Sequence, residues 1–202
     1  MRLHAVVPVK DLASAKSRLA GTLSPDSRRS LMRLMLGRVL TTLTACSGVD
    51  RELAAVWVVS RDVEVLAVAA NMGARPIRET GGGLNPALDQ ARKTIRAAQA
   101  DAMLILPADV PLVHCDDVRG LRSALIGGAD IVIAPDAAES GTNALGLWLS
   151  AALPFQFGQA SFARHRALAA WNELIVEVYR SPTLALDVDD AASLDHYQAV
   201  AC

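Results

Sequence analysis

One carboxylate in this sequence stands between two prolines. Residues 105–112 read ILPADVPL, an apolar run that ends at Pro107 and sets Asp109 shortly before Pro111. Because proline fixes its own φ and has no N–H to donate, the two prolines predict a rigid, non-helical turn. Asp109 is therefore expected to be held in a defined position.

A second group of acids lies near the C-terminus in LDVDD, residues 186–190. In an extended segment Asp187 and Asp189 point to the same side, because side chains alternate with period two. Asp190 then faces the other way and suits the cap of a helix that begins near Ala191. The residue types alone favour a capping turn with surplus acids, and a cation site is the alternative.

Basic residues gather in the loop 8–21, which spaces Lys10, Lys16 and Arg18 along small residues. Lysine and arginine in such a loop suit a triphosphate, whose charge they neutralise and orient. An exposed loop with solubilising charges is the alternative. The loop lacks the GxxxxGK[ST] pattern of a P-loop, and no GxGxxG follows it, so neither a Walker-type nor a dinucleotide-binding site is supported.

Glycines and hydroxyls occur together in three other segments. SGTNAL (140–145) and FGQAS (157–161) combine glycine with hydroxyls and backbone amides, which cradle a phosphate without a full positive charge. GGGLN (81–85) precedes a helix whose first turn contains Pro86, so Leu84 and Asn85 are candidates for contact with a base or ribose. A mobile surface loop is the alternative there. His165 falls one helical turn after Ser161 and is a candidate anion contact.

The elements that must position these residues follow from short apolar runs that alternate with helical periodicity. Nearly continuous β-branched segments predict strands buried on both faces at 3–9, 54–60, 102–107 and 130–135. Ser24 and Pro25 suit the start of a helix, and further helices are predicted at 63–71, 86–100, 116–126 and 162–174. The pattern predicts a single α/β domain over 1–202, with three layers, a mostly parallel sheet and right-handed crossovers.

Ligands of open α/β sheets bind beyond the carboxyl ends of the strands, where loops converge. The basic loop, ADVP and DAAESGTNAL each follow a predicted strand and should form the site. Up to Arg38 the chain has eight basic residues and two acids, whereas residues 187–195 carry four acids and no base. These regions could meet around a polyphosphate and its metal, but charge asymmetry alone favours solvated surface.

Composition excludes several classes of protein. With 202 residues, 52% hydrophobic content and a net charge of −1, the chain can bury one core but does not resemble a nucleic-acid or membrane-surface binder. No apolar run reaches membrane-spanning length, and no signal peptide is expected. Three scattered cysteines predict no disulfide framework and a reducing, cytoplasmic location. The sequence leaves the oligomeric state open, a homodimer included.

Six motifs in order carry a family resemblance: VVPVKDLASAKSRLAGTLS, LNPAL, LPADVPL, GTNAL, FGQASFARH and LDVDDAASL. Between Val6 and Leu194 the chain resembles the CofC/FbiD guanylyltransferases of coenzyme F420 biosynthesis. The resemblance implies a GT-A-like nucleotidyltransferase fold. It also implies an enzyme that transfers GMP from GTP to 2-phospho-L-lactate, phosphoenolpyruvate or 3-phospho-D-glycerate and releases pyrophosphate.

The resemblance also implies roles for individual residues. Nucleotidyl transfer brings two anions together, and Mg²⁺ held by a few carboxylates neutralises them. The expected metal ligands are Asp109, Asp187 and Asp189, and the expected catalytic residues are Asp109, Lys16 and Arg18. Nucleotide contacts are expected from Pro8, Lys10, Lys16, Arg18, Leu84, Asn85 and Pro107. Contacts with the acceptor's phosphate are expected from Thr142, Gly158 and Ser161.

One segment departs from the family pattern, which often reads GTGTN. This chain has Glu139 and Ser140 in place of the first glycine and threonine, so the implied roles do not extend to these two positions. Two alternatives stay open. A molybdopterin-type nucleotidyltransferase of the same fold would show a glycine-rich LAGG opening. This chain has no paired glycines in the corresponding segment, PVKDLASAKSRL. A catalytically silent nucleotide-binding regulator would predict loss of one acidic motif, whereas PADVP and LDVDD are both intact.

Overall fold

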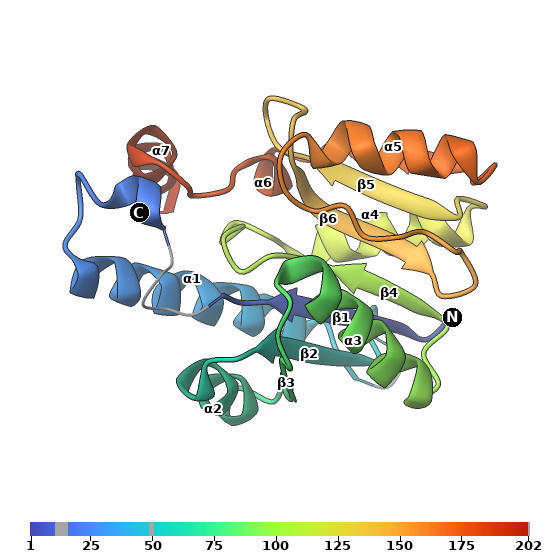
Figure 1. Cartoon of the computed structure of the whole chain (residues 1–202), viewed down its shortest axis with the longest axis horizontal. Coiled ribbons are helices and arrows are strands. Elements are labelled where there is room, and N and C mark those ends of the chain that lie inside the picture. The colour runs from blue at the N-terminus through green and yellow to red at the C-terminus, as the bar shows by residue number, and fades with distance from the viewer. Residues whose placement is uncertain (11–15, 49–50, 202) are drawn as a thin grey trace.

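The apolar segments of the sequence become the central strands of a mixed sheet. A computed structural model describes residues 1–10, 16–48 and 51–201, and these form a seven-stranded sheet with helices on both faces (Figure 1). The spatial order is β3-β2-β1-β4-β6-β5-β7. The strands are β1 Leu3–Pro8, β2 Ala55–Ser60, β3 Arg75–Arg78, β4 Ala102–Ile105, β5 Ile131–Pro135, β6 Thr142–Trp148 and β7 Val176–Val178.

Most neighbouring strands run parallel, as the sequence predicts. β1 pairs in parallel with β2 and β4, β2 with β3, and β5 with β7. β6 lies antiparallel to both β4 and β5. The carboxyl ends of β1, β4 and β5 therefore meet the start of β6 at one edge of the sheet, where loops from distant parts of the chain converge.

Two apolar cores fill the space between the sheet and its helices. Strand side chains alternate between them: in β4, Ala102 and Leu104 pack into one core and Met103 and Ile105 into the other. The first core is covered by α1 Pro25–Ala45, α2 Val63–Asn71, α4 Cys115–Ile126, α6 Pro182–Ala185 and α7 Ala191–Ala201. The second is covered by α3 Leu84–Ala97 and α5 Ser161–Trp171. This arrangement confirms the three predicted layers. Among the described residues, no helix is long and apolar enough to cross a membrane.

Helix starts agree closely with the predicted caps. Ser24 Oγ accepts a hydrogen bond from Ser27 N at 3.1 Å, and Pro25 is the first residue of α1. The α3 helix begins at Leu84, two residues before its predicted start, after Gly83 with φ of 90°. Such a positive φ favours glycine, and it turns the GGG segment into the helix.

The structure corrects the placement of Thr142. The sequence interpretation put SGTNAL in a loop, but Thr142 begins strand β6. Gly146 lies inside this strand, and a Cβ there would stand 2.7 Å from Val132 Cγ1. The glycine is therefore required by close packing of β6 against β5 and does not mark a turn.

The structure also corrects the cysteine prediction, because Cys46 and Cys115 form a disulfide with Cα atoms 5.8 Å apart. Cys46 follows the end of α1, and Cys115 begins α4. The fold places these two helix ends side by side although 69 residues separate the cysteines. Spacing along the chain carries no signal for such a pair.

Two buried histidines make the fold sensitive to acid. His4 is 2% exposed, and its Nδ1 accepts a hydrogen bond from Trp57 Nε1 at 3.0 Å. Burial, with smaller contributions from Arg2 and Arg75, lowers the pKa of His4 from 6.5 to about 4. Burial also lowers the pKa of His165 to about 4. Both side chains are therefore neutral in the folded protein at pH 7.

We expect the free energy of unfolding to have its plateau value above pH 6.5 and to fall as the pH decreases toward about 4. In this window the unfolded chain binds protons that the folded chain does not, so each proton favours unfolding. Urea denaturation at several pH values measures the loss. His4→Asn keeps an acceptor for Trp57 but removes one titrating group, so its loss should be smaller. A loss equal to that of the wild type would contradict the role of His4.

Candidate active site

A cavity of about 680 Å³ lies beyond the carboxyl ends of β1, β2 and β4. It gathers every site residue predicted from the sequence except Asn85 and His165. The lining residues among them are Pro8, Lys10, Lys16, Arg18, Leu84, Pro107, Asp109, Thr142, Gly158, Ser161, Asp187 and Asp189. Part of the predicted basic loop, 11–15, lies outside the described residues.

A buried ammonium joins the two acidic motifs. Lys16 Nζ lies 2.7 Å from Asp109 Oδ2 and 2.6 Å from Asp189 Oδ1, and the Lys16 side chain is 4% exposed. Burial alone would lower the pKa of Lys16, but the charges of Asp109 and Asp189 raise it above its usual value. Lys16 therefore stays charged and holds two carboxylates that would otherwise repel each other.

The C-terminal acids are fixed by the backbone between them. Val188 N donates a hydrogen bond to Asp109 O at 3.0 Å, and Val188 is fully buried. Asp187 and Asp189, on either side, both line the cavity, as the period of two predicts. Burial raises the pKa of Asp187, and the nearby charge of Asp109 adds to this effect. Asp190 Oδ1 accepts from Ser193 N at 2.9 Å, which confirms its predicted capping role at α7.

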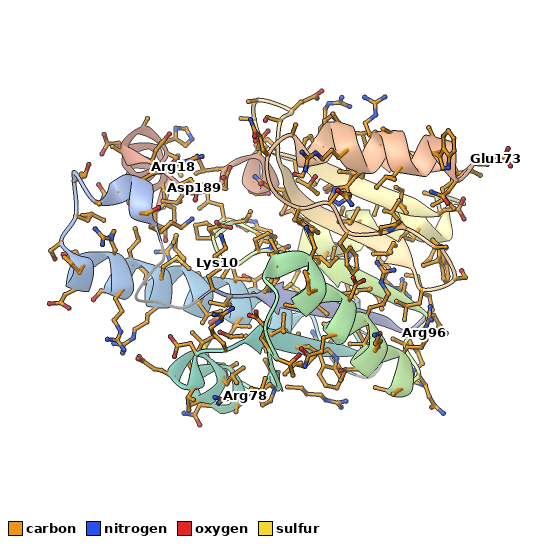
Figure 2. All side chains as sticks on the ribbon, in the orientation of Figure 1. Lys10, Arg18, Arg78, Arg96, Glu173 and Asp189 are labelled. Carbon is orange, nitrogen blue, oxygen red and sulfur yellow. A yellow bond between two sulfur atoms is a disulfide. The ribbon has the colours of Figure 1, made fainter. Side chains whose placement is uncertain are left out.

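The remaining cations lie at the rim of this charged half. Arg18 belongs to a short 3₁₀ helix, Ser17–Leu19, and its side chain is 77% exposed with Nη1 3.8 Å from Asp189 Oδ2. Figure 2 shows Arg18 beside Asp189, with Lys10 nearby. Lys10 is exposed and also lines the cavity. Both side chains keep the freedom to meet an incoming anion.

The other half of the cavity is lined by hydroxyl groups, with the Asp136 carboxylate beside them. Thr142 and Ser161 line it with hydroxyl groups, and both residues are buried. Thr142 Oγ1 lies 3.1 Å from His165 Nδ1, and Gln156 N donates to His165 Nε2 at 3.0 Å. His165 is fully buried and does not line the cavity. Its predicted anion contact is therefore corrected: it lies behind Thr142.

Several of the backbone amides predicted to bind phosphate donate hydrogen bonds within the protein. Asp136 accepts hydrogen bonds from Ser140 N and Gly141 N, each at 2.8 Å. Ser161 N donates to Gly158 O at 3.2 Å. These bonds close the turn before β6 and the first turn of α5, so they leave the hydroxyl groups as donors toward the cavity. The sequence interpretation missed Asp136, which carried no signal beyond a lone acid after a strand.

Asn85 supports the site from behind its wall. Its side chain makes both hydrogen bonds that the Phe157 backbone offers: Asn85 Nδ2 donates to Phe157 O at 3.2 Å, and Phe157 N donates to Asn85 Oδ1 at 2.9 Å. Asn85 thereby holds the segment that leads to Gly158 against the start of α3. Its predicted contact with a base or ribose stays a prediction.

Comparison with known proteins agrees with this geometry. Residues 3–197 match the model of the family "Guanylyl transferase CofC like". This chain belongs to that family. It is 41% identical over 193 residues to a phosphoenolpyruvate guanylyltransferase of Chloroflexus aggregans. This alignment covers 96% of this chain and 95% of the relative. It is 40% identical over 195 residues to a 2-phospho-L-lactate guanylyltransferase of Methanothermobacter thermautotrophicus. This alignment covers 96% of this chain and 83% of the relative.

Solved structures support the fold of this CofC-like chain. A nucleotidyl transferase from Methanothermobacter superimposes with a TM-score of 0.65 over 98% of both chains, at 18% sequence identity. The predicted three-layer nucleotidyltransferase fold is confirmed. Together with the family match, this makes the CofC-like protein a nucleotidyltransferase.

The departure from the family pattern has a structural account in this CofC-like chain. Glu139 Oε1 pairs with Arg180 Nη2 at 2.8 Å and does not line the cavity. Ser140 contributes its backbone, which accepts from Phe162 N at 3.2 Å. Gly141 keeps the family glycine because a Cβ there would lie 2.8 Å from Asp136 Oδ2.

We expect Asn85→Ala to cost about 1 to 3 kcal/mol of stability, because it leaves the Phe157 N–H without its acceptor. Hydrogen exchange at the Phe157 amide should become faster, and chemical denaturation measures the stability loss. Asn172→Ala is the control, since exposed Asn172 donates to Leu168 O within one helix end. An unchanged exchange rate at Phe157 in Asn85→Ala would rule out this supporting role.

Proposed function

We propose that this CofC-like protein transfers GMP from GTP to a small phosphorylated three-carbon acid in coenzyme F420 biosynthesis and releases pyrophosphate. One observation carries the proposal: a single cavity has a half around Lys16 that concentrates charged groups and a hydroxyl-lined half around Thr142 and Ser161. The names of the relatives favour phosphoenolpyruvate and 2-phospho-L-lactate as acceptors. We keep 3-phospho-D-glycerate as a third candidate.

In this proposal the nucleotide occupies the charged half. The triphosphate is bound by three cations, Lys10, Lys16 and Arg18. Lys10 and Arg18 line the rim with exposed cationic groups, and Lys16 lies beneath them. Pro8 and Pro107 line the same cavity at the ends of β1 and β4, and Leu84 lines it at the start of α3, where it suits contact with the base or ribose.

The carboxylates fit Mg²⁺ as a bound cofactor. Asp109 and Asp189 each direct an oxygen to the same ammonium, so a cation already has two carboxylates at one place. Within the described ranges, no three acidic, histidine or cysteine side chains cluster closely enough to hold a metal by themselves. Mg²⁺ suits such a site because it takes remaining ligands from phosphate and water. It would neutralise phosphate charge during transfer, with Asp187 as the nearest further carboxylate.

The chain's own groups position the acceptor. The hydroxyls of Thr142 and Ser161 and the segment at Gly158 line the hydroxyl-lined half, where a phosphate can be recognised without a buried lysine or arginine. Gly158 has a φ of 124°, which lets the backbone approach a ligand closely. Holding two substrates in one cavity supplies the alignment that in-line phosphoryl transfer requires.

An assay with each of the three candidate acids as acceptor tests this function directly. The wild type should form a GMP conjugate of at least one of the three acids with GTP and Mg²⁺, as judged by product mass. Asp109→Asn and Asp189→Asn should lower turnover by about 100-fold or more, because charge neutralisation in the transition state is lost. Asp190→Asn is the control, since Asp190 caps α7 and asparagine caps helices as well. GTP binding without transfer to any acid would instead support the silent regulator.

We expect Lys16→Met to move two affinities in opposite directions. The affinity for Mn²⁺ alone should rise, because the ammonium no longer competes for Asp109 and Asp189. The KM for GTP should rise by about tenfold or more, because a charge-assisted bond to phosphate is lost. Calorimetry and initial rates measure the two effects. Lys10→Met is the control for Mn²⁺, whose affinity it should not change. Weaker Mn²⁺ binding in Lys16→Met would contradict the assignment of this carboxylate pair.

A further inference from the structure

A buried histidine determines how the Thr142 hydroxyl can bind a ligand. His165 is fully buried, and its two ring nitrogens have different partners. Nε2 faces the backbone N–H of Gln156 at 3.0 Å, and Nδ1 faces Thr142 Oγ1 at 3.1 Å. The Phe157 ring packs edge-on against the imidazole, with centroids 5.0 Å apart. The ring therefore has one fixed orientation.

The partner of Nε2 decides which nitrogen carries the proton. A backbone N–H can only donate, so Nε2 must be the acceptor. A neutral imidazole has one N–H, which must then be on Nδ1. The ring is neutral because burial lowers the pKa of His165 to about 4. Nδ1–H consequently donates to Thr142 Oγ1.

This donation fixes the direction of the Thr142 hydroxyl. A hydroxyl that accepts from one side still has its own hydrogen to donate. Within the described residues no carbonyl or carboxylate accepts that hydrogen, and Thr142 lines the cavity. The hydrogen is thus available to an anionic oxygen on the cavity side. The backbone amides of Ser140, Gly141 and Ser161 already donate hydrogen bonds within the protein. A ligand therefore depends more strongly on the Thr142 hydroxyl as a donor.

We propose that His165 is a positioning residue which, as the Nδ1–H tautomer, makes Thr142 a dedicated hydrogen-bond donor to the phosphate of the acceptor. The proposal rests on the proposed function for the identity of the ligand. The tautomer itself follows from the hydrogen bonds alone. His165 does not touch the ligand and acts only through Thr142.

Nitrogen NMR of the histidine rings tests the tautomer in the free protein. At pH 7 the His165 spectrum should show a protonated Nδ1 and an unprotonated Nε2. His165→Gln identifies the resonances. A protonated Nε2 would overturn the proposal whether or not the protein has the proposed activity.

Two matched variants test the effect on the acceptor. His165→Asn places an amide N–H where Nδ1–H lies and keeps the donor to Thr142, whereas His165→Gln reaches the Nε2 position and keeps the acceptor for Gln156 N. His165→Gln should raise the KM for phosphoenolpyruvate by about 3- to 10-fold, the range of one net hydrogen bond. His165→Asn should stay closer to the wild type, and calorimetric GTP binding without acceptor should not change in either variant.

A purely structural role predicts a different pattern. Both variants lose the imidazole and one hydrogen bond, so structural damage would raise the KM equally, and equal effects would overturn the proposal. In a Thr142→Val background, His165→Gln should add no further change in KM, and an additional rise would also overturn it. If the wild type uses none of the acids, the proposed function fails, while the NMR result still decides the tautomer.

Discussion

The Lys16 ammonium holds together three segments that are remote in sequence. Asp109 is 93 residues away and Asp189 is 173 residues away, yet both carboxylates bind the same buried nitrogen. Removing the ammonium would leave the Asp109 and Asp189 carboxylates, whose side chains are 28% and 43% exposed, facing each other without a counter-ion, and their repulsion would destabilise this junction. The backbone bond from Val188 to Asp109 completes this junction and fixes α7 behind it. The wall of the cavity thus depends on an ion cluster that also supplies its charge.

Strand β6 divides the cavity into its two halves. Its first two residues face opposite sides of the sheet, as period two requires. Thr142 turns toward His165 and α5, whereas Asn143 Nδ2 donates to Leu184 O at 2.9 Å and to Asp187 Oδ1 at 3.3 Å. One strand end therefore orients a hydroxyl in the hydroxyl-lined half and the Asp187 carboxylate in the half around Lys16. A shift of β6 by one residue would exchange these two environments, so the antiparallel register with β4 and β5 sets the chemistry of the site.

Sequence reasoning located β1, β2, β4, β5 and the charged residues because both leave local signals, but it missed the central strand β6 and placed its first residues in a loop. Continuous apolar runs mark strands buried on two faces, and prolines or alternating acids mark fixed turns. The edge strands β3 and β7 are short and carry exposed charged residues, so they have no such signal. Contacts between distant segments were not predictable: the disulfide, the Asn85 bond to Phe157 and the position of Lys16 between two acids all require the folded chain. His165 shows this limit. Its spacing from Ser161 suggested an anion contact, but its burial behind Thr142 could not be predicted from the sequence.

Under the proposed function, the charges of the cavity favour a cation beyond those of the protein in the half that would hold the nucleotide. Arg61 pairs with Glu79 at 3.1 Å, so these two charges balance each other, whereas Asp136 keeps its negative charge although two backbone amides donate to it. Asp109, Asp187 and Asp189 remain around the single buried ammonium of Lys16. A polyphosphate placed beside this surplus of carboxylates would meet net repulsion, which the exposed Lys10 and Arg18 offset only through solvent-screened interactions. Under the proposed function, a divalent cation neutralises these carboxylates and the polyphosphate, and the hydroxyl-lined half keeps the acceptor's phosphate apart from Asp109, Asp187 and Asp189.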